Sequence, residues 1–203
     1  MEIATTGVLA SAAGAIRATV GAVAGQWGDA PADGTTTFGA VLTIDVDASV
    51  PGGVPLLQPG TTHRAVVQVG PDRPGSEPRW LNVKIPDAYA PGQDQDFLLA
   101  SSGDGAPMHH AVLPSDPVAP LYSSLWLYLA GLSPLLFGVR PPVTGPAVRF
   151  GPGDELNFMV SPPVGRFRRV AVLTLTEQID RPIRFSGRSS GGNIRPLPPV
   201  NFY

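Results

Sequence analysis

Three short apolar runs separated by turn-forming residues constrain the fold most, and they lie within residues 63–102. The runs are residues 65–69, 80–85 and 97–100. In the middle run, aliphatic side chains alternate with polar ones: Leu81, Val83 and Ile85 against Asn82 and Lys84. A period of two predicts a strand with one buried face, and the Pro, Gly and Asp between the runs favour turns. The stretch therefore predicts an antiparallel meander, one wall of a barrel or sandwich.

Further strands are predicted on both sides of this meander, at residues 38–47, 155–160 and 168–177. Residues 38–47 alternate well, and residues 168–177 are rich in β-branched side chains. Asp45 and Asp47 would share one face of the first of these strands. We interpret them as a solvated pair rather than metal ligands, because no third carboxylate lies near them.

Composition limits the class of protein and its partners. A chain of 203 residues is expected to form one domain, and 43% hydrophobic residues in alternating runs favour folding despite 24 glycines and 24 prolines. The absence of cysteine excludes disulfides, thiolate metal sites and a cysteine nucleophile. A net charge of −2 argues against nucleic acid as a partner. Only 15% of residues are charged, which suggests that a second subunit covers part of the surface.

An N-terminal helix or arm is predicted for residues 1–27, where apolar side chains recur at helical spacing. Glu2 stands where a secretory signal would have a basic residue, so a cytoplasmic location is expected. A membrane-surface helix is the alternative. It is disfavoured because Arg17 is the one cation of this segment.

The most apolar run of the chain, residues 121–139, predicts a peripheral core helix over about 121–138, within a helical insertion at 119–139. Gly131 and Pro134 are expected to break this helix. A membrane-associated helix is the alternative, because the run has the length of a spanning segment. The barrel domain is expected over residues 28–185. Residues 186–203 are expected to form an extended tail that wraps over the domain or a neighbour.

Chemical motifs are scarce. Glycine-rich phosphate loops, nucleophile elbows and paired-histidine metal motifs are all missing from the sequence. His109 and His110 are adjacent, so on an extended segment their rings would point to opposite sides. A zinc site formed by these two residues and His63 is therefore disfavoured, and we predict no metal-binding residue.

The central stretch resembles the core of the haem catalases and their smaller catalase-like relatives. The resemblance rests on four motifs in order: Gln58-Pro59-Gly60, Pro78-Arg79-Trp80-Leu81, Gln95-Asp96-Phe97-Leu98, and Phe185-Ser186 followed by Ile194-Arg195-Pro196. It covers roughly residues 35–198. It implies a mainly β (α+β) fold, namely an antiparallel catalase-like β-barrel with a few peripheral helices and an extended C-terminal tail.

The departures from this family bear on activity. The family's distal histidine falls on Pro31, which has no ring nitrogen to move a proton during peroxide cleavage. An arginine of the family falls on Gln68, and the asparagine partner of the distal histidine falls near Ala100 or Ser101. Tyr203 lies closer to Ile194 than the family's haem-ligating tyrosine would.

The resemblance therefore leaves Gln68, Arg79 and Tyr203 as candidate cofactor-binding residues, and it names no catalytic residue. Ordinary catalase activity is not expected. The first hypothesis is a non-catalytic, cofactor-free barrel that acts as a structural, assembly or ligand-binding protein, either as a homo-oligomer or with a partner protein. The alternative is a haem-dependent peroxidase or oxygenase with an altered site that acts on an apolar small molecule. In that case His63, His109 or His110 would replace the lost groups.

Overall fold

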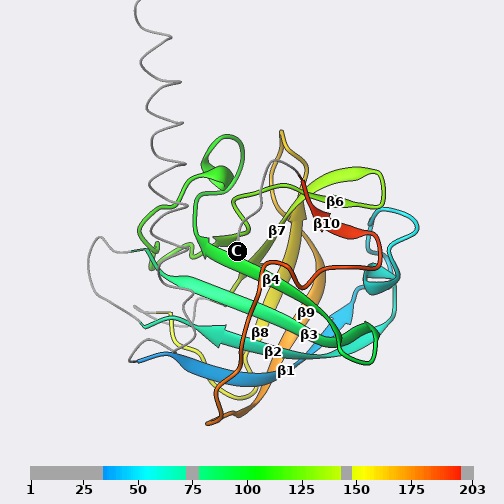
Figure 1. Ribbon diagram of the computed structural model, residues 1–203. Helices are drawn as coiled ribbons and strands as arrows, with labels where there is room; N and C mark the ends of the chain where they lie inside the picture. Colours follow the sequence, from blue (N-terminus) through cyan, green and yellow to red (C-terminus); the bar gives the residue numbers. More distant parts are fainter. Residues whose placement is uncertain (1–33, 72–77, 143–147, 198–203) are drawn as a thin grey trace, which may run out of the picture.

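The computed structural model describes residues 34–71, 78–142 and 148–197 as a mainly β protein (Figure 1). Two short 3-10 helices, Pro55–Leu57 and Met108–His110, interrupt the described strands. The strands are β1 Thr36–Ile44, β2 Thr62–Val69, β3 Trp80–Ala90, β4 Gln93–Ser101, β5 Tyr122–Ser123, β6 Tyr128–Ala130, β7 Ser133–Arg140, β8 Glu155–Ser161, β9 Arg168–Gln178 and β10 Ile194–Pro196.

Eight of these strands close into an antiparallel barrel. Each of β1, β2, β3, β4, β5, β7, β8 and β9 pairs with the next in this order, and β9 pairs back with β1. Strands that follow one another along the chain are neighbours in the ring, as in an up-and-down barrel, but the connections range from residues 91–92 between β3 and β4 to residues 102–121 between β4 and β5. Strand β6 pairs with the first half of β7, and β10 pairs with β6, so these two strands extend outside the ring. The antiparallel barrel predicted from the alternating runs is confirmed, as are the strands predicted at 155–160 and 168–177. The strand predicted at 38–47 is confirmed only as far as Ile44, and Asp45 and Asp47 lie beyond its end.

The barrel interior is filled by apolar side chains from alternate positions of its strands. Leu81, Val83 and Ile85 of β3 all point inward and are at most 1% exposed. Aromatic rings occupy the middle: the Phe97 ring centroid lies 4.5 Å from that of Phe137 and 5.4 Å from that of Phe158. Barrels of eight strands are narrow enough for side chains to fill them completely.

The prediction of a helix over about 121–138, in a helical insertion at 119–139, is wrong. This segment forms β5, β6 and β7, and Gly131 and Leu132 make the turn between β6 and β7. Gly131 has a φ of 62°, which a residue without a side chain adopts easily. The segment is apolar throughout because β7 is buried on both faces. Leu135 and Phe137 belong to the barrel core, whereas Leu136 packs against Met159 and Phe167 outside it.

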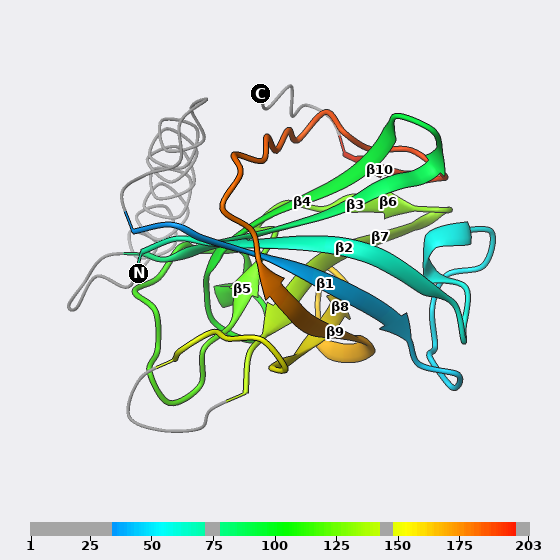
Figure 2. The ribbon, with the colours of Figure 1, turned by 90° about the horizontal axis from the view of Figure 1, so that it is seen from below.

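After β9 the chain crosses the outside of the barrel as an extended segment, residues 179–197, which we call the strap (Figure 2). Its backbone is attached at several points. Ile179 N–H donates to Thr37 O at 2.8 Å, and Asp96 N–H donates to Ser189 O at 2.9 Å. Further along, Gly131 N–H donates to Asn193 O at 2.7 Å. The strap ends in β10, after which Leu197 N–H donates to Leu127 O. It thus joins the start of β1 to the β6–β7 hairpin.

The predicted N-terminal helix at residues 1–27 and the end of the predicted tail lie outside the described residues. Among the residues that the structure does describe, no helix has both the length and the hydropathy needed to cross a bilayer.

Candidate functional site

Gln68 lies on the outer face of β2. Its neighbours Val67 and Val69 belong to the barrel core, so the alternation of the strand directs the Gln68 side chain away from the interior. It is 7% exposed, and its Oε1 accepts a hydrogen bond of 3.5 Å from Asn82 Nδ2 on β3. The side chain therefore does not line the inside of the barrel.

Arg79 lies just before β3, at one end of the barrel. Its Nε donates to Gly70 O at 3.0 Å, and its Nη1 donates to Val148 O at 3.1 Å. The guanidinium also lies over the Phe150 ring, 5.0 Å from the centroid. These contacts join the end of β2 to the segment before β8, so this arginine supports the end of the barrel.

Of the other positions named by the resemblance, Ala100 and Ser101 are described by the structure, and they contact β5 and the backbone around Arg79. Pro31 and Tyr203 lie outside the described residues. Ser101 Oγ accepts Arg79 N–H at 3.0 Å and donates to Leu113 O, so both of its bonds are to backbone groups. Ala100 lies opposite Ser123 on β5. The described residues therefore do not fit a haem inside the barrel, because Phe97, Phe137 and the other core side chains fill that space.

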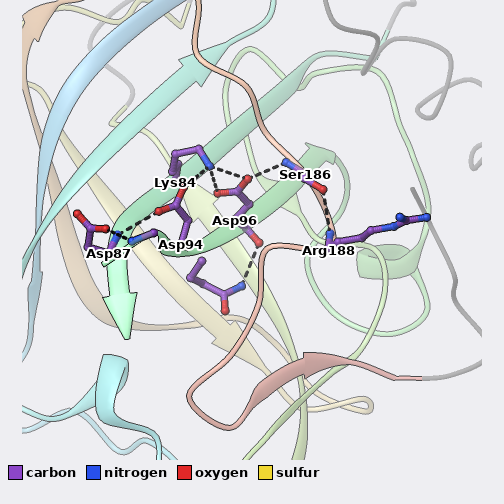
Figure 3. Close-up of polar contacts among 8 residues, drawn as sticks. Lys84, Asp87, Asp94, Asp96, Ser186 and Arg188 are labelled. Carbon is purple, nitrogen blue, oxygen red and sulfur yellow. Dashed lines mark hydrogen bonds and ion pairs between the residues drawn. The ribbon is translucent and has the colours of Figure 1, made fainter. Parts of the chain in front are cut away.

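A buried cluster of charged residues lies on the outer face of β3 and β4 instead (Figure 3). Lys84 on β3 is paired in register with Asp96 on β4. Its Nζ lies 2.8 Å from Asp96 Oδ1 and 3.0 Å from Asp94 Oδ2. Asp96 has no exposed surface, and Lys84 is only 9% exposed. Opposite charges on facing strands attract each other, and burial strengthens this attraction at the cost of desolvating both groups.

The strap closes over this charged cluster. Ser186 N–H donates to Asp96 Oδ2 at 2.7 Å, and Lys84 Nζ lies 5.6 Å from the centre of the Phe185 ring (Figure 3). Burial raises the pKa of Asp96, although the hydrogen bonds from Lys84 and Ser186 oppose this. Burial also acts to raise the pKa of Asp94, but the hydrogen bonds from Asp87 N–H and Lys84 outweigh burial, and the net effect is a lowered pKa.

The charged cluster was not predicted, although part of its signal is in the sequence. Lys84 interrupts an apolar strand, and Asp94 and Asp96 sit at the start of the next one. The register that places these side chains opposite one another is set by the β3–β4 turn, and Ser186 arrives from far along the chain. Asp96 is fully buried and its carboxylate is bonded to the strap, so the cluster holds the strap and this carboxylate is not accessible to a substrate.

The three histidines do not form a metal-binding group among the described residues. His109 and His110 lie on the 3-10 helix and not on an extended segment, so the expectation that their rings point to opposite sides is wrong: the two rings meet edge to face, with centroids 4.3 Å apart. His63 lies on β2, where its Nε2 is 3.2 Å from Thr61 Oγ1. His109 is fully buried, with Nε2 3.2 Å from Pro163 O and Nδ1 3.4 Å from Ser161 Oγ. Burial and then the adjacent His110 lower the pKa of His109, so this imidazole is neutral near pH 7. The buried His109–Ser161 pair fixes a loop rather than presenting a nucleophile.

An open groove lies on the outside of the barrel beside the start of the strap. Its volume is about 610 Å³, within the ~300–1,000 Å³ typical of ligand sites. Small side chains from β1 and β2 contribute to its lining, and charged ones stand around it: Arg64, Asp87, Glu177 and Arg181. The sequence did not reveal this groove, because four separate segments form it.

No His, Cys, Asp or Glu group suited to a metal ion occurs in the described part of the chain. No family model and no curated protein sequence matches this chain. The class that the structure defines is thus an eight-stranded antiparallel barrel with a filled interior and a strapped outer face.

Proposed function

We propose that this protein is a non-catalytic, catalase-like barrel that acts as a structural, assembly or ligand-binding protein in the cytoplasm. One observation carries the proposal: the interior is packed with aromatic and aliphatic side chains. Gln68 lies on the outer face of β2, and Arg79 binds backbone carbonyl groups at one end of the barrel. A barrel packed in this way binds through its outer surface. The low charge content favours contact with a second copy or a partner protein rather than with nucleic acid.

Titration of the purified protein with haemin, followed by absorbance, tests the first part of the proposal. We expect no stoichiometric Soret band and no peroxidase activity. A stoichiometric band with turnover of an apolar substrate would overturn the proposal in favour of the haem-dependent enzyme. In that event, loss of the band in Tyr203→Phe would identify the phenolate as the iron ligand.

Light scattering during size-exclusion chromatography tests the assembly role. We expect a homo-oligomer, or a complex that forms when a partner is supplied. A protein that stays monomeric and binds no acidic, basic or apolar probe would contradict an assembly or binding role.

A further inference from the structure

The strap is a positively charged segment of the described surface. It carries four arginines against one aspartate, Asp180, and all four arginines are exposed: Arg181, Arg184, Arg188 and Arg195. The whole chain has 14 lysines and arginines and 16 aspartates and glutamates. Outside the strap, acidic residues therefore outnumber basic ones, so the strap is net positive on a chain whose remainder is net negative.

These arginines project from a backbone that is held in place. The strap is bound at Thr37, at Asp96 and at Gly131, on three different strands or turns. Within the described ranges, none of the four guanidinium groups forms a hydrogen bond or ion pair with a side chain. Figure 3 shows Arg188 directed away from the buried Lys84–Asp96 cluster. Exposed guanidinium groups on an anchored backbone suit carboxylates, which arginine binds in a bidentate manner.

The groove described above adjoins the beginning of the strap. Arg181 of the strap and Arg64 of β2 both line it, and Val41 and Val66 form apolar parts of its wall. Glu177 also lines the groove. Its pKa is lowered, first by a hydrogen bond from Thr176, and the positive charge of Arg64 acts in the same direction. Asp87 lines the groove too, so its two carboxylates balance the two arginines, and the groove offers a small apolar surface next to the positive strap.

We propose that the strap and the groove together bind an extended acidic peptide segment of a partner protein. Carboxylates of the segment meet the strap arginines, and an apolar side chain enters the groove. A peptide fits better than nucleic acid or an anionic membrane, because the positive surface is narrow and the rest of the chain is acidic. A long phosphate backbone or a bilayer would meet that acidic surface as well. This inference rests on the proposed role as a binding protein and specifies its partner.

Fluorescence anisotropy with the full chain tests the proposal. The probe is a short labelled peptide of glutamates around a single leucine, and an all-glutamate peptide serves for comparison. We expect the triple variant R181Q/R184Q/R188Q to bind about tenfold more weakly and with less dependence on salt. The matched control, R149Q/R166Q/R168Q, removes three exposed arginines that lie off the strap and should retain the affinity.

The groove has its own test. Val41→Phe fills it from a partly exposed position, so this variant should weaken binding of the leucine-containing peptide and leave the all-glutamate peptide unaffected. Circular dichroism confirms that each variant is folded.

Four results would overturn the inference: no binding of either peptide at low salt, equal losses in the two triple variants, no effect of Val41→Phe, or equally tight binding of an oligonucleotide or phosphatidylserine vesicles. The haemin titration is independent of these results. If the protein binds no haemin, forms an oligomer and does not bind the peptides, the acidic-peptide proposal is wrong, whereas the proposed non-catalytic barrel is still supported.

Discussion

At the scale of single residues, Lys84 has the largest expected effect on stability. It lies between two carboxylates, and one of them, Asp96, is completely buried. Lys84→Met leaves that carboxylate without its cation, which should cost about 3–5 kcal/mol of unfolding free energy near neutral pH. Urea unfolding measures this loss. The exposed pair between Arg169 and Asp45 is the control, and Arg169→Met should cost under about 1 kcal/mol.

The loss in Lys84→Met should shrink as the pH falls. Burial already raises the pKa of Asp96, and removing Lys84 raises it further. A carboxyl whose pKa is raised on folding favours the folded state at low pH, and this contribution disappears as the pH rises through the raised pKa. The variant should therefore recover relative to the natural protein at mildly acidic pH. Equal losses at both pH values would contradict this explanation, and K84M/D96L should restore stability at neutral pH.

Gly192 is a second residue with a predictable effect. Its φ is 50°, and a Cβ there would overlap the Tyr89 ring. Gly192→Ala should therefore cost more than backbone strain alone, about 2–4 kcal/mol in a thermal or urea unfolding experiment. Gly92→Ala is the matched control, because Gly92 has a φ of 75° but nothing within 4 Å of the added Cβ. It should lose only about 1 kcal/mol, and equal losses would show that contact with Tyr89 is unimportant.

At the scale of elements, the strap depends on Asp96. Because Ser186 N–H donates to its carboxylate, Asp96→Asn weakens a charge-assisted bond that holds the strap to β4. Amide exchange around Ser186 should accelerate about tenfold or more, while exchange in β1 and β9 stays unchanged. Mass spectrometry of peptic fragments reports both. Asp94→Asn is the control, since Asp94 contacts Lys84 but not the strap. Faster strap exchange in the control as well would contradict a specific role for Asp96.

The elements also show where a local pattern misleads. In β3 one face is apolar and the other polar in the middle of the strand, so alternation identified it correctly. In β7, Leu135 and Leu136 face opposite sides and both are buried, in two different clusters. A strand buried on both faces loses its alternation and cannot be told from a buried helix by period alone. Gly131 and Pro134 were predicted to break a helix, but Gly131 lies in the turn of the β6–β7 hairpin and Pro134 lies within β7, opposite Leu129.

At the scale of the whole molecule, the filled interior sets the stability. Phe137 is fully buried and lies against the rings of Phe97 and Tyr128, with centroids 4.5 and 5.5 Å away. Phe137→Ala opens a cavity at the centre of a closed barrel and should cost about 3–5 kcal/mol. Leu132→Ala, at a position 95% exposed, should be nearly neutral.

The closed ring of strands also predicts that the barrel unfolds cooperatively. Every barrel strand has two paired neighbours, so the ring should lose its structure in one transition, and tryptophan fluorescence and circular dichroism should coincide during unfolding. Separate midpoints for the two signals would contradict a single cooperative barrel.

The candidate site could be anticipated only in part. Gln68 and Arg79 were singled out through a resemblance, but the strand places Gln68 outside the barrel and Arg79 binds backbone carbonyls at its end. The sequence AVVQV has apolar residues at both parities, so it does not say which face of β2 points inward. The groove was missed because four separate segments form it. The strap arginines lie in one segment, but only the structure shows that this segment is attached to the barrel with all four of them exposed.

The amino-acid sequence by itself determined that the chain forms short antiparallel strands, since alternation and turn residues act over neighbouring positions. Only the tertiary structure decided that β9 returns to β1, that aromatic rings fill the enclosed space, and that Ser186 meets Asp96. These contacts join residues far apart in the chain, and their partners are selected by the closure and register of the whole barrel.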